Sequence, residues 1–371
     1  MIYFLSNEEV LQKVKSKNVA IGFIGLGRVG LPLACVLASK GFNVTGIDIK
    51  ESGVNSVNNG KNPYPDEEGL TKLISSCTAS STLKASTNIK DASNCEVFII
   101  AVPTLIANEQ PEIAAVETVA KELSAIIKPG SLVVLQSTVP PGTTEDVLGK
   151  IISQHTGFIA GKAFGLAYSP ERTQSPQVLK DLQAYPKIVG GIDEKSTFIL
   201  SLIYKSFAPS IIEMSSIVPA ELDKLAENTY RDVNIAFANE LAIICQLYNI
   251  NVNEIITTAN SQPYCHILKP GLVGGHCIPM DPYYIISDSV KHGFTPSLIT
   301  TARRLNEEMF DRVVKMLPPE AKNVTLLGLS FKENIASFAT SHSLKLIEKL
   351  TQKGYKVTVH DPFLDDADYG F

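Results

Sequence analysis

A glycine fingerprint close to the amino terminus is the feature that most constrains how this chain can fold. An apolar run at residues 19–24 leads into Gly-Leu-Gly-Arg-Val-Gly, and a helical stretch follows at once. The next apolar run ends at Asp48, eighteen residues beyond Gly30. The phosphate-binding half of a Rossmann-like fold has this order: a strand, a glycine turn, a helix and a second strand that ends in an acid. The predicted dinucleotide site consists of Gly25, Gly27, Arg28, Val29, Gly30 and Asp48.

The acid at the end of the second strand favours one nicotinamide dinucleotide over the other. A carboxylate at Asp48 binds ribose hydroxyls and repels a 2′-phosphate, so we expect NAD rather than NADP, although Lys50 is a mild signal in the other direction. Two later strand ends carry Val-Pro-Thr at 102–104 and Ser-Thr-Val-Pro-Pro-Gly at 137–142. Ligands of such sheets lie outside the carboxyl ends of the strands, so Thr104 and Thr138 are predicted to line the nicotinamide side.

The order of the apolar runs predicts the domain organisation. Further strands are expected at 97–102, 132–136 and 164–168, with helices between them, which indicates a doubly wound parallel α/β sheet. Residues 220–247 contain no glycine or proline and predict a long central helix. A new strand–helix–strand unit follows at 324–360. We therefore expect an NAD-binding domain at 1–210, a helical domain at 211–317, and an apparently incomplete second α/β domain at 318–371.

Composition excludes several classes of partner. The chain has 371 residues and a formal net charge of −5, which argues against nucleic acid or an anionic membrane as a partner. The first 18 residues include acids and no unbroken apolar core, so we expect no signal peptide. No apolar run is long enough to span a bilayer. The six cysteines are scattered without a Cys-x-x-Cys pair, which favours reduced thiols in the cytoplasm.

A single cysteine stands in a segment rich in glycine and proline. Cys277 follows Gly274 and Gly275 and precedes Pro279, and Asp281 lies four residues on, one helical turn away. A thiolate with a carboxylate beside it suits covalent attack on a carbonyl carbon. The alternative is a buried structural cysteine in a tight turn. Two Cys-His pairs, at 265–266 and 276–277, lack metal-ligand spacing, so we expect no metal.

Polar residues elsewhere could serve this thiol. Lys224, Asn228 and Arg231 share one face of the long helix, as a pocket wall or as a solvated face. Glu171 and Arg172 follow the strand at 164–168. Beside NAD, this set indicates that an alcohol is oxidised to an aldehyde, trapped as a thiohemiacetal, oxidised to a thioester and hydrolysed.

The motifs together resemble those of the UDP-glucose/GDP-mannose dehydrogenases. These motifs are GLGRVGLPLA, VPT, STVPPGTT, SPER, KLAENTYRDVNIAFANELA, GGHCIPMDP and GLSFKEN, over residues 20–362. The resemblance implies NAD-dependent, four-electron oxidation of the C6 hydroxyl of a UDP-sugar to a uronate for polysaccharide precursors. The long-helix and cysteine motifs are similar to the branch acting on UDP-N-acetylglucosamine or UDP-N-acetylmannosamine. A homodimer through the long helix is also implied.

The resemblance assigns roles residue by residue. Cys277 is the implied nucleophile, Lys224 and Asn228 hold the oxyanion, Asp281 assists the thiol or water, and Glu171 lies near the reacting water. The implied substrate-binding residues are Arg172, Thr173, Arg231, Gly274, Gly275, Phe331 and Lys332. The chain departs from the family pattern at Ser175-Pro176, and at Ser337 and Ala339, where an acid and a ligand-binding arginine are usual.

Two other functions remain open on the sequence. A two-electron dehydrogenase of the β-hydroxyacid type shares the first domain and the Lys/Asn helix but has no need of the cysteine motif. A non-catalytic NAD-binding paralogue would account for the departures near the carboxyl terminus. The number of NADH formed per substrate separates the first from the favoured reading, and UDP-sugar binding separates the second.

Overall fold

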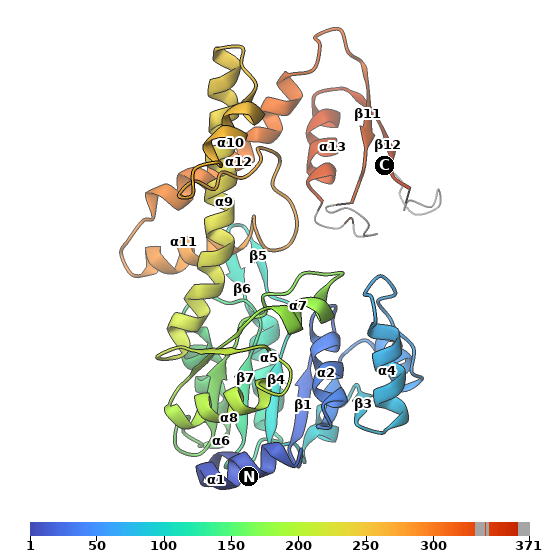
Figure 1. The fold of residues 1–371 in the computed structure, drawn as a ribbon, viewed down its shortest axis with the longest axis vertical. Coiled ribbons are helices and arrows are strands. Elements are labelled where there is room, and N and C mark those ends of the chain that lie inside the picture. Colours follow the sequence, from blue (N-terminus) through green and yellow to red (C-terminus); the bar gives the residue numbers. More distant parts are fainter. Residues whose placement is uncertain (331–337, 339–340, 363–371) are drawn as a thin grey trace. The chain divides into compact units, whose positions relative to one another are not determined.

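The computed structural model describes residues 1–330, 338 and 341–362, and divides into two compact units, Met1–Lys224 and Leu225–Phe371. The boundary falls inside one long helix, α9 (Ile217–Leu247). The division into domains at 1–210, 211–317 and 318–371 stays a prediction. Figure 1 shows the elements of both units in chain order.

The first unit is built on a predominantly parallel sheet with the strand order β10-β9-β8-β7-β4-β1-β2-β3. Its strands are β1 (Ala20–Ile24), β2 (Asn43–Ile47), β3 (Leu83–Ser86), β4 (Val97–Ile100), β7 (Leu132–Leu135), β8 (Gly165–Tyr168), β9 (Lys187–Gly191) and β10 (Ile211–Glu213). The predicted doubly wound sheet is confirmed. One junction differs, because β9 runs antiparallel to β8 and β10 then follows β9 in parallel.

Alternate residues of the central strands enter two separate cores, as a sheet covered on both faces requires. Val97 and Ile99 of β4 pack into one core, and Phe98 and Ile100 into the other. The first core is closed by α1 (Asn7–Lys15), α2 (Gly30–Ser39), α3 (Glu51–Asn58), α4 (Leu70–Ala79), α7 (Val178–Ala184) and α8 (Glu194–Tyr204). The second is closed by α5 (Ala114–Ser124), the π-helix η3 (Thr144–Gly149), α6 (Lys150–Thr156) and the first turn of α9.

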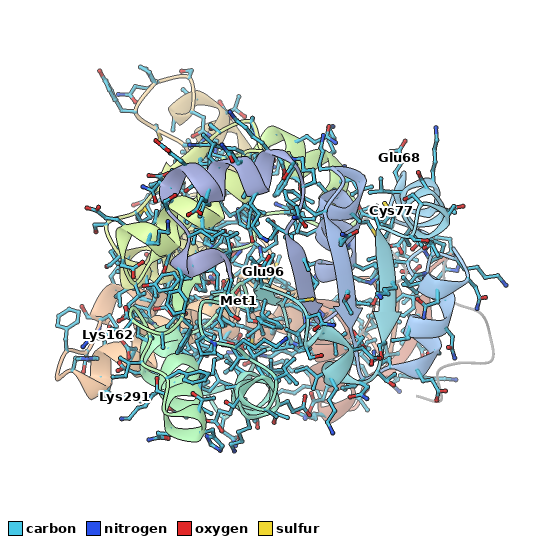
Figure 2. The ribbon with its side chains drawn as sticks, turned by 90° about the horizontal axis from the view of Figure 1, so that it is seen from below. Met1, Glu68, Cys77, Glu96, Lys162 and Lys291 are labelled. Carbon is cyan, nitrogen blue, oxygen red and sulfur yellow. The ribbon has the colours of Figure 1, made fainter. Side chains whose placement is uncertain are left out.

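The amino-terminal segment is fastened to this sheet. A 3-10 turn, η1 (Ile2–Phe4), precedes α1, and Ser6 and Glu9 form a capping box at the start of α1. Glu96, just before β4, receives the Met1 amino group at 3.8 Å and Lys13 at 3.0 Å, and Figure 2 shows Met1 beside Glu96. Shorter elements are η2 (Ile89–Ala92) and the hairpin of β5 (Leu105–Ala107) and β6 (Gln110–Glu112).

The second unit begins within α9 and continues through α10 (Val252–Ala259), α11 (Asp281–Lys291) and α12 (Ser297–Lys315). It ends in β11 (Asn323–Leu327), α13 (His342–Gln352) and β12 (Lys356–His360), with the two strands parallel. Asp361 after β12 accepts hydrogen bonds from the backbone N–H groups of Leu329 and Ser330 after β11, at 2.7 and 3.1 Å. The predicted strand–helix–strand unit is therefore present.

Candidate active site

The glycine turn between β1 and α2 has the shape that a dinucleotide needs. A Cβ on Gly25 would stand 2.2 Å from the carbonyl oxygen of Ala101, and one on Gly30 would stand 2.0 Å from that of Gly25. At Gly27, by contrast, no atom of the described residues lies within 4 Å of the Cβ position, apart from those of Gly27 and its chain neighbours. The outer glycines thus allow close backbone packing, and the middle one leaves room for a pyrophosphate.

Asp48 follows β2 and directs its carboxylate to this turn. Its Oδ2 accepts a hydrogen bond from the Leu26 N–H at 2.8 Å, and its Oδ1 accepts one from the Lys50 N–H at 2.8 Å. Each carboxylate oxygen keeps a lone pair for a ribose hydroxyl. The side chain of Lys50 is exposed. Together with the open space at Gly27, these residues fit NAD.

Two residues that sequence reasoning missed hold the middle of the fingerprint. Arg28 forms an ion pair with Asp66, with Nη1 and Oδ2 2.6 Å apart, and its guanidinium lies 5.3 Å from the centre of the Tyr64 ring. The Tyr64 hydroxyl donates to the Leu26 carbonyl at 3.0 Å. Nothing in the sequence marks Tyr64 or Asp66, because each lies 38 residues beyond its partner, Leu26 or Arg28.

The ends of β4 and β7 are joined at the same edge of the sheet. The Ser137 hydroxyl donates to the Val102 carbonyl at 2.8 Å and accepts from the Val102 N–H at 2.9 Å. Thr138 is the next residue, and Thr104 lies two residues past Val102, so both predicted nicotinamide-side threonines follow neighbouring carboxyl ends.

Glu171, just past β8, is held as an anion. Its Oε2 lies 3.1 Å from the buried ammonium of Lys187 on β9, and its Oε1 accepts from the N–H groups of Arg172 and Thr173 at 2.8 and 3.1 Å. Burial alone would raise the pKa of this carboxyl, but Lys187 and the two N–H donors lower it below its usual value. An ionised Glu171 suits a base. Lys187 was not predicted from the sequence.

The neighbours of Glu171 include a hydroxyl that suits a ligand. The Thr173 Oγ1 is buried and has no hydrogen-bond partner among the described residues. Arg172 donates from Nη1 to the Pro186 carbonyl at 3.3 Å. A buried polar atom without a partner is costly, and polar ligand atoms are a common reason for keeping one.

The polar stripe on α9 is buried rather than solvated. Lys224 and Asn228 are 9% and 5% exposed, and Arg231 is half-buried. Asn228 donates from Nδ2 to Oδ2 of Asp281 at 2.6 Å. The stripe therefore meets the first residue of α11, so the alternative of a solvated helix face is wrong.

Cys277 lies one turn before that same aspartate. Its carbonyl accepts the Asp281 N–H at 2.8 Å, which confirms the expected helical spacing. Cys277 itself is exposed, so a buried structural cysteine is excluded. Gly275 has φ +91°, a conformation that glycine adopts without strain. A Cβ on Gly274 would stand 2.6 Å from Nδ1 of His342 at the start of α13, so this loop packs closely on that helix.

Buried amides hold the beginning of the cysteine loop. Asn239 of α9 donates to the Gly271 carbonyl at 3.0 Å and accepts the Gly271 N–H at 2.8 Å. It also donates to Oδ1 of Asn306 at 2.9 Å, and Asn306 donates to Oδ1 of Asp232 at 2.8 Å. Arg303, 1% exposed, forms an ion pair with Asp232. Sequence reasoning missed this network, because polar residues on long helices are usually exposed.

Comparison with known proteins gives a consistent result. Models of the UDP-glucose/GDP-mannose dehydrogenase family match residues 19–208 (NAD binding domain), 219–308 (central domain) and 325–370 (UDP binding domain). The chain belongs to this family. It is an NAD-dependent UDP-sugar dehydrogenase.

Individual relatives are similar over most of the chain. UDP-N-acetyl-D-mannosamine dehydrogenase of Pyrococcus horikoshii is 34% identical and covers 93% of this chain and 84% of its own. The solved structure of that enzyme from the same organism has a TM-score of 0.87, is 33% identical, and covers 95% and 85%. NDP-N-acetyl-D-galactosaminuronic acid dehydrogenase of Ralstonia nicotianae is 35% identical and covers 90% and 80%.

Several predictions on the dehydrogenase stay untested by the geometry. Phe331, Lys332, Ser337 and Ala339 lie outside the described residues. Across the described ranges, no group of three or more histidine, cysteine, aspartate or glutamate side chains could hold a metal ion.

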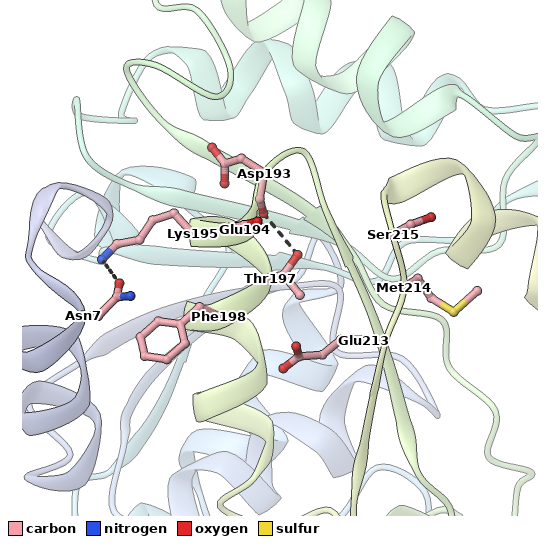
Figure 3. Close-up of a pocket in the computed structure, with 9 residues that line it drawn as sticks. All are labelled: Asn7, Asp193, Glu194, Lys195, Thr197, Phe198, Glu213, Met214 and Ser215. Atoms are coloured by element: carbon pink, nitrogen blue, oxygen red, sulfur yellow. Dashed lines mark hydrogen bonds between the residues drawn. The ribbon is translucent and has the colours of Figure 1, made fainter.

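A surface hollow of about 990 Å³ lies away from the cofactor edge of the dehydrogenase (Figure 3). It is lined by residues at or just beyond the ends of β9 and β10, among them Asp193, Lys195 and Glu213. Because β9 is antiparallel to β8, these residues lie at the end of the sheet where β8 begins. Asp48, Thr104 and Thr138 follow the opposite ends of their strands, so this hollow is not the cofactor site.

Proposed function

We propose that the dehydrogenase oxidises the C6 hydroxyl of a UDP-N-acetylhexosamine to a carboxylate in two steps, with Cys277 as the covalent nucleophile. The observation that carries the proposal is the Asn228–Asp281 hydrogen bond of 2.6 Å. It joins the polar stripe of α9 to the turn that begins at Cys277, so three of the predicted residues belong to one constellation.

Each residue has a task set by its chemistry. Two molecules of NAD, bound in turn, would each accept one hydride, and the hydroxyl proton released in each oxidation would leave to a base. The Cys277 sulfur adds to the aldehyde carbon, and the aldehyde oxygen takes a proton, giving a thiohemiacetal. After the second oxidation, water replaces the sulfur of the thioester and releases the carboxylate and the thiol.

Lys224 and Asn228 are proposed to donate hydrogen bonds to the oxygen that gains charge at each step. Asn228 has a second Nδ2 hydrogen available for this, because only one is used by Asp281. Asp281 would orient the thiol or water, and ionised Glu171 would accept a proton from water. Arg172, Thr173, Arg231, Gly274, Gly275, Phe331 and Lys332 are proposed to bind substrate, and Arg28, Val29, Thr104 and Thr138 to bind NAD with the glycines and Asp48.

The preferred sugar is proposed from the relatives. Two of the relatives named above act, by name, on an N-acetylated sugar nucleotide. Initial rates of NADH formation with UDP-glucose, UDP-N-acetylglucosamine, UDP-N-acetylgalactosamine and UDP-N-acetylmannosamine test this. Fastest turnover of UDP-glucose would contradict the choice of an N-acetylhexosamine.

The nucleophile is tested by Cys277→Ala with Cys265→Ala as the matched control. Cys265 is a second thiol in the preceding loop, only partly buried. We expect Cys277→Ala to lower uronate formation by at least about 1,000-fold, because thioester formation is lost, whereas Cys265→Ala stays within about threefold of wild type. Two NADH per uronate in the wild type are expected. One NADH per substrate, or full activity of Cys277→Ala, would support the β-hydroxyacid-type alternative.

We also propose a homodimer that forms through α9, in the cytoplasm. Tyr230, Phe237 and Ile244 are 57%, 51% and 44% exposed and recur every seven residues along α9. Such a seam is typical of helices that pair with another helix. Within the described ranges, no helix is both long and apolar enough to cross a membrane.

A further inference from the structure

A fully buried carboxylate lies near the start of α9, outside the residues assigned so far. Glu221 is 0% exposed and accepts three hydrogen bonds from the loop after β7. Its Oε2 receives the Gly142 N–H at 2.6 Å. Its Oε1 receives the N–H and the hydroxyl of Thr144 at 2.9 and 2.6 Å. One side chain thus accepts three hydrogen bonds from residues 142–144.

The donors stand at the start of a helix, which explains why they need an acceptor. Thr144 opens η3, which continues directly into α6, so its N–H belongs to the donors that a helix start leaves unsatisfied. Helix starts at the carboxyl edge of a doubly wound sheet are ordinary sites for anions. Here the anion is a side chain of α9. Gly142 has φ +86°, which lets the chain turn and present its N–H.

The loop that is hydrogen-bonded to Glu221 begins at the cofactor edge of the sheet, after β7. Thr138 stands six residues before Thr144, and Ser137 ties the start of the loop to the end of β4. Lys224 lies three residues after Glu221 on α9, on the next turn, and is 9% exposed. Glu221 therefore connects the loop that carries Thr138 to the helix turn that carries Lys224.

We propose that Glu221 is a positioning residue, whose ionised carboxylate fixes the loop at 138–144 and the start of α9 in one register. The proposal rests on the proposed function, since it assumes that Thr138 faces NAD and that Lys224 faces the reacting oxygen. Protonation weakens this clamp, because a carboxylic O–H then faces backbone N–H groups that can only donate.

The ionisation of Glu221 falls within the physiological range. Burial raises the pKa of this carboxyl to about 7, the three donors oppose the rise, and Glu145 of η3 adds repulsion of like charge. The clamp is thus mostly ionised above pH 7 and mostly protonated below it.

The pH profile of kcat/KM for NAD tests the clamp. In the wild type we expect a rise through a midpoint near pH 7. Glu221→Gln removes the charge and turns an NH2 toward these donors, so we expect kcat to fall about tenfold to 100-fold and this rise to disappear. Glu221→Asp keeps a carboxylate and should keep a pH-dependent rise. A wild-type profile and a kcat within twofold in Glu221→Gln would overturn the proposal.

Two variants that leave Glu221 in place test the proposal if Glu221→Gln does not fold. Thr144→Val removes one donor to the anion, so the midpoint should move to higher pH. Glu145→Gln removes a repelling charge, so the midpoint should move to lower pH with kcat unchanged. A purely structural role predicts no movement in either variant, and that result would overturn the proposal.

Failure of the proposed function is recognised separately. It would appear as no NADH from any UDP-sugar with the wild type. Calorimetric titration of NAD at pH 6 and pH 8 then tests the clamp alone. We expect tighter NAD binding at pH 8 in the wild type and equal binding at both values in Glu221→Gln. Equal binding at both values in the wild type would overturn the clamp.

Discussion

Lys187 shows how one side chain sets the charge of a candidate catalytic carboxylate. Its ammonium is 4% exposed and lies 3.1 Å from Oε2 of Glu171, which is itself 11% exposed. It also stands 5.3 Å from the centre of the Tyr204 ring. Because Lys187 opposes the effect of burial, the pKa of Glu171 is lowered. Glu171 therefore stabilises the fold above the usual glutamate pKa, and that contribution is lost as the pH falls through the lowered value.

Lys187→Met should reverse this dependence. Burial then dominates, the pKa of Glu171 rises, and ionisation destabilises the fold as the pH increases beyond about 4.5. We expect the variant to lose about 3 kcal/mol of unfolding free energy at pH 7, with a smaller loss at pH 4.5. Thermal unfolding across this pH range measures the difference. The double variant Glu171→Gln/Lys187→Met removes both charges and should recover part of the loss. A loss that does not change with pH would contradict the ion pair.

At the scale of elements, α9 fastens the cysteine loop through an amide. Asn239 makes two hydrogen bonds to the backbone of Gly271. Asn239→Ala removes both hydrogen bonds to Gly271, which costs about 1 kcal/mol of stability because Gly271 is exposed and water can take the place of the amide. We also expect kcat to fall about tenfold, because the loop that leads to Cys277 loses its anchor. Asn253→Ala on the exposed face of α10 is the control and should change neither quantity. Unchanged kcat in Asn239→Ala would show that the loop is held by other contacts.

The same elements show what sequence patterns reveal. Apolar runs predicted β1, β2, β4, β7 and β8 to within one or two residues, because buried parallel strands are continuously apolar. β9 was missed, since it starts with Lys187 and ends in two glycines. The ion pair with Glu171, sixteen residues earlier in the chain, stabilises a buried lysine there. The Asn239 network was missed for the same reason.

The prediction of individual site residues depended on the same difference between local patterns and long-range contacts. Asp48, Asn228, Asp281 and Cys277 stand at fixed spacings from glycines or from each other, so a local pattern was enough to predict them as site residues. Glu221 and Asp66 act on residues 77 and 38 positions away, and such partners are visible only in three dimensions. Long-range hydrogen bonds and ion pairs therefore set the limit of the sequence-based prediction.

At the scale of the whole molecule, the seam on α9 predicts how two copies associate. Tyr230, Phe237 and Ile244 are exposed on α9, while its opposite side is buried through residues such as Asn239. Exposed aromatic and aliphatic residues in register gain free energy only when a partner covers them. Light scattering should therefore give a mass near twice the 40.2 kDa of one chain.

Phe237→Glu places a charge in the seam and should give a mass of 40.2 kDa at micromolar concentration. Phe294→Glu alters a ring outside α9 that is even more exposed, 65% against 51% for Phe237. This control should stay dimeric, because the loss of apolar surface outside the seam does not disturb the interface. If Phe294→Glu dissociates while Phe237→Glu does not, the interface lies elsewhere on the chain.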